Sequence, residues 1–251
     1  MSWAWAYATD VGKRAEAKGK NNEDRSHSFV KDNTLYQIVA DGNGSTDELG
    51  PASFVVNEVE RFVDTYSEEN MSVDEIKRML KGAVYCANRV LLAYKRSDID
   101  KYATNVFSTI CFSAITPDNH FVYIWCGDSR VYLIRGGQMF AISKDHTEAQ
   151  SLCDEGKITK EEIFSHPERD ILTSAIGFNN PKIEVLDAQL QQGDIVLMMT
   201  DGIHKMLQPQ QIVDIVQAAG NCEDTCEGLI KASNINGGVD NMAITIAYIT
   251  D

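Results

Sequence analysis

The first forty residues carry the pattern of β-strands. Residues 2–9 alternate between large apolar side chains and small or polar ones, and this period of two is typical of a strand. Two further apolar-rich segments, 26–31 and 34–40, flank Asp32-Asn33, which is a pair that favours tight hairpin turns. We therefore predict a strand, a polar loop and then a β-hairpin.

Apolar residues recur every three or four positions in the next part of the chain, which is the period of an amphipathic helix. This pattern covers segments 51–66 and 73–94. Ser72 and Glu75 stand at the start of the second segment with the spacing of a capping box. Two helices are therefore expected after the hairpin.

The rest of the chain returns to short apolar runs separated by turn residues, and helical periodicity then follows once more. Strands are predicted at 107–115, 120–126, 130–135, 139–143, 182–191, 194–200 and 242–250, and helices at 208–219 and 223–233. A polar, partly helical insertion covers 147–178. Groups of strands thus alternate with pairs of helices, which predicts an α+β fold with antiparallel sheets and helices outside them. No linker rich in Pro, Gly or Ser divides the chain, so residues 1–251 are expected to form a single domain.

Composition narrows the classes of function. The chain has a formal net charge of -14, whereas a nucleic-acid-binding protein would present a basic face. It contains no apolar run of about 18 residues, so no membrane-spanning helix is expected. Cys222 and Cys226 have a helical spacing but no matching pair and no nearby histidine, which argues against a zinc site. We expect a monomer in the reducing cytoplasm that binds neither nucleic acid nor membrane.

Carboxylates gather at the ends of predicted strands. Asp41, Asp201 and Asp240 each stand beside glycine or asparagine and next to an apolar run, and Glu23-Asp24 lies upstream. A carboxylate at the mouth of a buried strand is costly unless a cation meets it. A single Asp-Gly pair is usually only a turn, so the interpretation depends on the whole set. Together these residues predict an oxygen-ligand site for hard divalent cations.

The residue types around each carboxylate suggest how such a site would be built. Asp41 is the best candidate for a ligand that bridges two cations, because Gly42 and a second glycine two positions later follow it. Glycine lets backbone carbonyl groups approach a cation and adopts unusual φ angles. Asp201 and Asp240 would bind from other strand ends, and Glu23 would complete the second cation. This is the set of ligands that a two-metal phosphohydrolase needs.

Short motifs follow one another in order along nearly the whole chain. They are Asn22-Glu23-Asp24, Asp41-Gly42-Asn43-Gly44, Phe107-Ser108-Thr109, Gly127-Asp128-Ser129-Arg130, Asp145-His146-Thr147, His166-Pro167 with Leu172-Thr173 and Gly177, Thr200-Asp201-Gly202, and Asp240-Asn241. The ordered set resembles the metal-dependent protein phosphatases of the PPM class, which are the type 2C serine/threonine phosphatases, in their bacterial form. Each motif is weak alone, but the set in this order is specific.

The resemblance implies a central sandwich of two antiparallel β-sheets flanked by pairs of α-helices, with a metal cleft at one end. It also implies two divalent cations, Mn2+ or Mg2+. Their ligands would be Glu23, Asp41, the carbonyl group of Gly42, Asp201 and Asp240. Turnover should depend most on the three aspartates of this set.

The resemblance also assigns the neighbouring residues and the reaction. Asp24 and Asn241 would lie behind the ligands, and Asp128 would hold a third, weaker cation together with Asp201. Asp128 could instead cap a turn and pair with Arg130. The implied reaction hydrolyses phosphoserine or phosphothreonine of protein substrates, by attack of a water held between two cations and without a phosphoenzyme. The insertion at 147–178 would form a flap.

Two positions near the site depart from the family pattern. An arginine that holds substrate phosphate usually precedes the Glu-Asp pair, but Gly19 stands there. Arg14 is the preferred replacement, because its planar fork can bind two phosphate oxygens, and Lys20 is the second choice. Asn43 replaces a histidine that is proposed as a general acid in eukaryotic members, which leaves metal-bound water to protonate the leaving group.

The flap departs from the pattern as well, and two alternative functions stay open. Asp170 and Ser174 stand where asparagine and arginine are common, so the substrate contacts of the flap are expected to differ. The first alternative is a catalytically silent PPM-fold module that binds a partner, but such a module would lack ligand carboxylates, and none is lost here. The second is a phosphohydrolase of small molecules, which the missing arginine allows.

Overall fold

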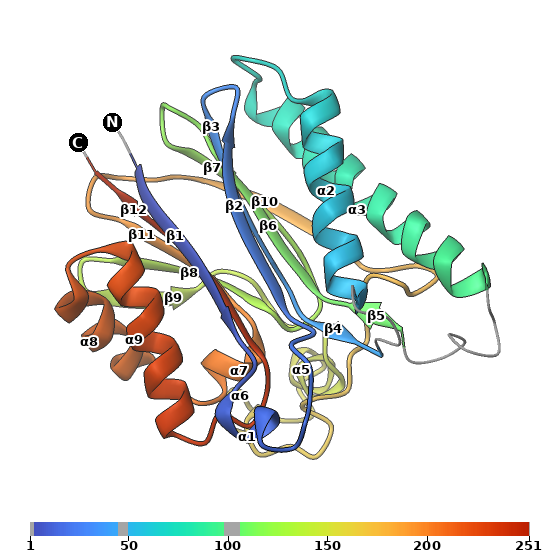
Figure 1. The fold of residues 1–251 in the computed structure, drawn as a ribbon, viewed down its shortest axis with the longest axis vertical. Helices are drawn as coiled ribbons and strands as arrows, with labels where there is room; N and C mark the ends of the chain where they lie inside the picture. The colour runs from blue at the N-terminus through green and yellow to red at the C-terminus, as the bar shows by residue number, and fades with distance from the viewer. Residues whose placement is uncertain (1–2, 45–49, 98–105, 251) are drawn as a thin grey trace.

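Two antiparallel β-sheets form the centre of the molecule (Figure 1). The structure is a computed structural model that describes residues 3–44, 50–97 and 106–250. The first sheet contains, in spatial order, β1 (Trp3–Asp10), β12 (Met242–Ile249), β11 (Ile195–Met199), β8 (Arg130–Arg135) and β9 (Gln138–Ala141). The second sheet contains β10 (Glu184–Gln189), β7 (His120–Cys126), β6 (Ile110–Ile115), β3 (Thr34–Ala40) and β2 (Arg25–Lys31). Two short strands, β4 (Gly42–Asn43) and β5 (Phe107–Ser108), pair beside the sandwich.

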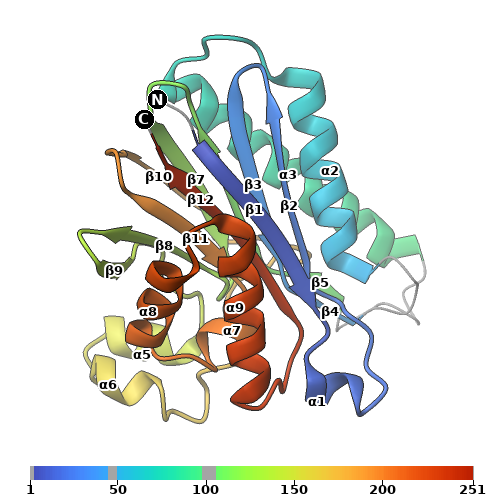
Figure 2. The same cartoon turned by 60° about the vertical axis from the view of Figure 1, so that its left-hand side comes forward.

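A pair of helices covers the outer face of each sheet (Figures 1 and 2). The second sheet is covered by α2 (Gly50–Tyr66) and α3 (Val73–Ser97), and the first by α8 (Pro209–Ala219) and α9 (Cys222–Ile235). Shorter helices lie near the end of the sandwich that is at the bottom of Figure 1, namely α1 (Lys13–Glu16), α5 (Glu148–Asp154), α6 (Lys160–Ile163) and α7 (Asp201–His204). The predicted α+β sandwich is confirmed. None of the helices in the described ranges has the length and hydrophobicity that a bilayer crossing requires.

Apolar side chains fill the space between the sheets. This cluster takes members from both sheets, including Leu35, Val39, Trp125, Val196 and Met198. Burial of each large apolar side chain contributes about 1.5–3 kcal/mol, so the cluster fixes the two sheets against each other. Cys222 and Cys226 are buried in a second apolar cluster, between the first sheet and its helices. These two cysteines therefore pack as core residues.

The local signals in the sequence produced the predicted turns and caps. Asp32 and Asn33 have φ angles of 48° and 58°, which is the left-handed conformation that a tight hairpin turn requires. The backbone N–H of Ser72 donates to the Glu75 carboxylate over 2.8 Å, so the capping box is present at the start of α3. The predicted bounds of most elements differ from the observed ones by one to three residues.

The predicted strand 107–115 is the main exception, because Thr109 divides it into β5 and β6. The backbone N–H of Thr109 donates to the Asp41 carbonyl oxygen over 2.8 Å, and the N–H of Asp41 donates to the Thr109 hydroxyl over 3.0 Å. Thr109 thus lies outside the second sheet, and its hydrogen bonds hold the backbone of Asp41. The break in the strand positions a candidate ligand.

Candidate active site

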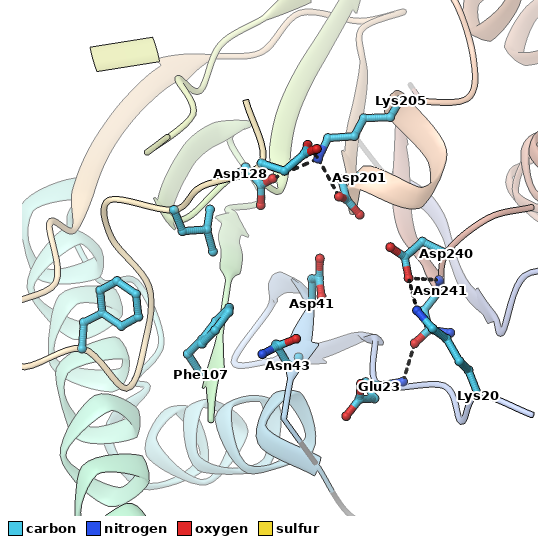
Figure 3. Close-up of a pocket in the computed structure, with 14 residues that line it drawn as sticks. Lys20, Glu23, Asp41, Asn43, Phe107, Asp128, Asp201, Lys205, Asp240 and Asn241 are labelled. Atoms are coloured by element: carbon cyan, nitrogen blue, oxygen red, sulfur yellow. Dashed lines mark hydrogen bonds and ion pairs between the residues drawn. The ribbon is translucent and has the colours of Figure 1, made fainter. Parts of the chain in front are cut away.

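A pocket of about 340 Å³ lies at the end of the sandwich, and most of the predicted site residues line it (Figure 3). The lining consists of Lys20, Glu23, Asp41, Gly42, Asn43, Phe107, Asp128, Asp170, Leu172, Phe178, Asp201, Lys205, Asp240 and Asn241. Every predicted metal ligand is in this set, as is Asn241. Asp24 is buried behind the pocket and is 2% exposed. Arg14 is not among the described lining residues, whereas Lys20 is.

The five carboxylates of the pocket that were predicted as metal ligands come from loops that leave both sheets at the same end. Glu23 precedes β2, Asp41 follows β3, and Asp128 lies between β7 and β8. Asp201 follows β11 as the first residue of α7, and Asp240 precedes β12. Figure 3 shows Asp41 in the middle of the pocket, with Asp128 and Asp201 on one side of it and Asp240 on another. The folding of the sandwich therefore brings together carboxylates that are far apart in the sequence.

Hydrogen bonds fix the loops that carry these carboxylates. The hydroxyl groups of Thr109 and Ser129 lie 2.6 Å apart, which ties the Asp41 loop to the loop that carries Asp128. The side-chain oxygen of Asn241 accepts from the backbone N–H of Glu23 over 2.8 Å. The side-chain N–H of Asn241 donates to the carbonyl oxygen of Val11 over 2.8 Å. Asn241 thus connects the last strand to the N-terminal loop.

Close backbone packing explains why glycine follows Asp41. A Cβ atom at Gly42 would lie 2.8 Å from the carbonyl oxygen of Glu23 and 3.0 Å from the backbone nitrogen of Ala52. Any larger residue would push apart the loop that carries Glu23 and the start of α2. The glycine therefore lets the backbone of Glu23 pack closely against the residue that follows Asp41.

Burial and mutual repulsion act on the carboxylates. Burial raises the pKa of Asp41 well above its usual range, and the charges of Asp24, Asp201, Asp128 and Asp240 raise it further. The pKa of Asp24 is also raised well above its usual range, first by burial and then by the Asp201 and Asp240 charges. One side-chain oxygen of Asp24, Oδ2, is buried and has no hydrogen-bond partner in the described structure. Without a cation, this arrangement destabilises the ionised carboxylates.

The donor chemistry of the pocket fits hard divalent cations. Its candidate ligands are all oxygen atoms, and Mg2+ and Mn2+ prefer such ligands. In the described ranges, no three His, Cys, Asp or Glu side chains converge closely enough to form a complete coordination group. The carboxylates thus surround one pocket but do not close on a single point. The side chains that would hold a cation pair therefore supply oxygen ligands, and they enter the pocket from the loops at the strand ends.

Lys205 is a pocket residue that the sequence did not predict. Its ammonium Nζ lies 2.7 Å from Asp201 Oδ2, 3.4 Å from Asp128 Oδ2 and 2.6 Å from Asp170 Oδ1. Burial lowers the pKa of Lys205, but the charges of Asp201 and Asp128 outweigh this effect and raise it. The spacing of four residues from Asp201 was the available signal, because residues four apart face each other on a helix.

Burial and repulsion from Asp201 raise the pKa of Asp128 to about 7, and Lys205 opposes this rise.

The two candidate phosphate-binding residues differ in position. Lys20 lines the pocket, and its Nζ lies 3.9 Å from Asp240 Oδ1. Its side chain is 55% exposed, so it can reach a ligand that enters from solvent. Arg14 lies in α1, where its backbone N–H donates to the Gly238 carbonyl oxygen over 2.8 Å. The geometry therefore favours Lys20 over Arg14, which reverses the order of preference drawn from side-chain chemistry alone.

The segment 147–178 borders the pocket on one side. Its residues Asp170, Leu172 and Phe178 contribute to the lining. Ser174, where arginine is common in the family, lies outside the lining, and its hydroxyl accepts from the backbone N–H of Lys182 over 2.6 Å. Asp170 and Ser174 are the two residues of this segment that differ from the family pattern. Asp170 lines the pocket, whereas Ser174 holds the backbone at Lys182.

Arg130 and His146 support the pocket from behind. Arg130 donates two hydrogen bonds to Asp145, at 2.8 Å and 2.7 Å, so its guanidinium group is paired with Asp145 and not with Asp128. The Nδ1 atom of His146 accepts from the backbone N–H of Gly127 over 3.2 Å. These contacts hold the loop that carries Asp128 against the start of the flap.

Comparisons with known proteins agree with this architecture. The sequence model of the protein phosphatase 2C family matches residues 11–233. The chain is 28% identical to the protein phosphatase PhpP of Streptococcus pneumoniae, over 97% of this chain and 96% of that protein. The structure of the S. agalactiae serine/threonine phosphatase superposes with a TM-score of 0.87 at 26% identity, covering 99% of this chain and 100% of that one.

A further solved structure shows the same fold at lower identity. It is the catalytic domain of the serine/threonine protein phosphatase PstP in complex with two manganese ions, with a TM-score of 0.79 and 23% identity, and the match covers 100% of each chain. The family match extends over most of this chain, and the relatives are covered nearly end to end. The chain therefore belongs to the protein phosphatase 2C family of metal-dependent serine/threonine protein phosphatases, which are phosphoric monoester hydrolases.

Proposed function

We propose that the pocket hydrolyses phosphoserine and phosphothreonine of protein substrates with two divalent cations, Mn2+ or Mg2+. The ligands would be Glu23, Asp41, the carbonyl group of Gly42, Asp201 and Asp240. The observation that supports this proposal is the meeting of all these residues in one pocket, although they come from loops at both ends of the sequence. When bound, the cations would supply Lewis acidity, lower the pKa of a water molecule and offset the charge of the phosphate.

The residues of the chain would position the reacting groups. Thr109 holds the backbone of Asp41 through two hydrogen bonds, so the position from which this carboxylate enters the pocket is set before any ligand binds. Asn241 holds the loop of Glu23 in the same way. Such preorganisation favours catalysis because no reorganisation is needed when the transition state forms. Lys20 would attract the phosphate dianion from solvent.

The source of the leaving-group proton follows from the lining. Asn43 occupies the place of the family's candidate general acid, and an asparagine side chain cannot supply a proton at neutral pH. The pocket lining contains no histidine in the described residues. Lys20 is paired with Asp240 and Lys205 with Asp128, so we assign this proton to water.

Two alternatives predict different results. A silent binding module would lack ligand carboxylates, yet Asp41, Asp201 and Asp240 all line the pocket. A small-molecule phosphohydrolase would hydrolyse nitrophenyl phosphate but would not prefer a phosphopeptide. The location in the reducing cytoplasm and the monomeric state stay predictions; the six free cysteines agree with a reducing compartment.

The test is hydrolysis of a phosphothreonine peptide, a phosphotyrosine peptide and nitrophenyl phosphate, each with Mn2+, Mg2+ or chelator. We expect metal-dependent release of phosphate from the phosphothreonine peptide and little from the phosphotyrosine peptide. Asp214→Asn is the matched control, because Asp214 lies on α8 and outside the pocket lining. No activity on any substrate with either metal would support the silent module.

A further inference from the structure

The Lys205 ammonium group occupies the centre of a cluster of three carboxylates. Lys205 directly follows α7, one helical turn after Asp201, and its side chain returns over that residue. Its Nζ contacts Asp201 Oδ2 at 2.7 Å, Asp128 Oδ2 at 3.4 Å and Asp170 Oδ1 at 2.6 Å. The side chain is only 24% exposed, so solvent screens these ion pairs less than it screens surface pairs.

The ammonium group uses the same oxygen atoms that a further cation would need. Divalent cations bind carboxylate oxygens at about 2.0–2.6 Å. A cation between Asp128 and Asp201 would therefore stand where Nζ stands, and two positive charges could not share that space. Lys205 leaves the second carboxylate oxygen of Asp201 available to the proposed cation pair.

The third contact joins the flap to the rest of the site. Asp170 belongs to the segment 147–178, whereas Asp128 and Asp201 follow strands of the two sheets. The Asp170 side chain is 57% exposed and forms two ion pairs, one with Lys205 and one with its neighbour Arg169. Of these two, only the pair with Lys205 connects the flap to another part of the site. A lysine in this place can hold the flap without any metal.

We propose that Lys205 takes the place of a third divalent cation, so that this enzyme binds two cations instead of three and its flap is held independently of metal. The inference rests on the cation pair of the proposed function. It is an alternative to the expectation that Asp128 and Asp201 hold a third, weaker cation, because the Lys205 ammonium group contacts the oxygen atoms that this ion would need.

The first test is the number of Mn2+ ions bound at saturation, measured by calorimetric titration and by metal analysis after dialysis. We expect two ions for the wild type and three for Lys205→Ala, whose shorter side chain opens the space. Lys205→Arg keeps the charge and should bind two ions. Lys157→Ala is the control, because Lys157 pairs with Glu155 on the surface of the flap and should not change the count.

The second test is hydrogen exchange of the peptide around Asp170, with and without Mn2+. In the wild type, its protection should be the same in chelator and in Mn2+. In Lys205→Ala, protection should fall in chelator and return when Mn2+ is added. Lys205→Gln gives a second variant of similar size, in which the loss of protection in chelator should be the same, in case the alanine variant folds poorly.

The outcomes separate the two proposals. Three ions in the wild type, or two in a folded Lys205→Ala protein, would overturn the role of Lys205 and leave the cation pair intact. Fewer than two ions in the wild type would overturn the cation pair, and the inference about Lys205 with it. Flap protection that depends on Mn2+ in the wild type would also contradict the inference.

Discussion

The carbonyl oxygen of Asn241 lies so close to Gly202 that a Cβ atom on Gly202 would be 1.9 Å from it. Asp201 and Asp240 are the chain neighbours of these two residues, so the contact sets the distance between two candidate ligand loops. Asn241 also holds the loop of Glu23 through its side chain. Glycine at this position therefore allows three ligand loops to meet.

Gly202→Ala should disrupt the site more than an ordinary substitution. Relief of the overlap must displace backbone, which costs about 3 kcal/mol, and the displaced atoms carry Asp201 and Asp240. We expect a lower melting temperature in chelator and a loss of Mn2+ affinity.

Gly193→Ala is the control, because Gly193 has a φ of 84° but no neighbour within 4 Å of its added Cβ. The control should lose about 1–2 kcal/mol and keep its Mn2+ affinity. Equal affinities in the two variants would show that the contact does not position the ligands.

Asp41→Asn should separate activity from stability. Loss of a hydrogen-bonded partner behind a metal ligand typically costs 10–100-fold, so loss of the central ligand should lower kcat/KM by more than about a hundredfold. In chelator, however, the neutral amide removes a charge that Asp24, Asp201 and Asp128 repel. The metal-free variant should therefore melt above the metal-free wild type, by roughly 2–4 °C for each kcal/mol of repulsion relieved. A lower melting temperature would mean that repulsion is not the dominant effect at Asp41.

Mn2+ should stabilise the wild type and should stabilise Asp41→Asn less. A ligand that binds only the native state adds about 2.7 kcal/mol at a concentration one hundred times its Kd. The measurement is the melting temperature of each protein in chelator and in increasing Mn2+. Asp214→Asn, on the surface of α8, should follow the wild type. A wild-type melting temperature that does not change with Mn2+ would contradict the cation site.

Most of the fold and the candidate ligands could be predicted because their signals are local. The hairpin at Asp32-Asn33 and the cap at Ser72 depend on residues a few positions apart, and both are present. The ligand loops were recognisable because strand ends with Asp next to Gly or Asn recur in a fixed order. The chemistry of Gly42 was predicted in part, but its tight packing against Ala52 could not be.

The residues that were not predicted depend on contacts between distant segments. Only one partner of Lys205, Asp201, is near it in the sequence, whereas Asp128 and Asp170 are 77 and 35 residues away, so its place among three carboxylates could not be predicted. Thr109 was predicted inside a strand, since the segment that follows it is mostly apolar, but its hydrogen bonds with Asp41 cross 68 residues. The preference for Arg14 over Lys20 came from side-chain chemistry, which carries no information on which residue reaches the pocket.

His146 should make the stability of the protein depend on pH. Burial lowers the pKa of His146 below the ordinary value, and its hydrogen bond to Glu184 opposes this only in part. An unfolded histidine has a pKa of about 6.5. The stabilisation from the neutral ring is thus fully present above about pH 6.5 and is lost as the pH falls through the lower folded pKa.

Urea unfolding in chelator between about pH 5 and pH 8 would measure this effect. His146→Asn should lower the unfolding free energy at pH 8, because the contacts with Trp125 and Glu184 are lost, and its difference from the wild type should become smaller toward pH 5.

Other groups titrate in the same range and act in opposite directions. Burial lowers the pKa of His204, whereas burial raises the pKa of Asp24, Asp41 and Asp128, and in chelator these three carboxyl groups favour the folded state as the pH falls. The contribution of His146 is therefore the difference between the wild type and His146→Asn at each pH. Glu184→Gln removes a contact that raises the pKa of His146, so its unfolding free energy should fall further below that of the wild type as the pH decreases. An unchanged slope in His146→Asn would assign the pH dependence to other groups.

Lys20 should anchor the substrate phosphate, and Arg14 should contribute less. Lys20 lines the pocket near Asp240, whereas Arg14 is outside the described lining. An exposed ion pair contributes up to about 1 kcal/mol, so Lys20→Ala should raise the KM for a phosphopeptide by up to about fivefold. The kcat should change little, because an anchor contacts the ground state and the transition state alike. The effect should shrink at high salt, since the charge is exposed. Arg14→Ala is the matched control from the same basic segment, and a larger KM change in that variant would return the anchoring role to Arg14.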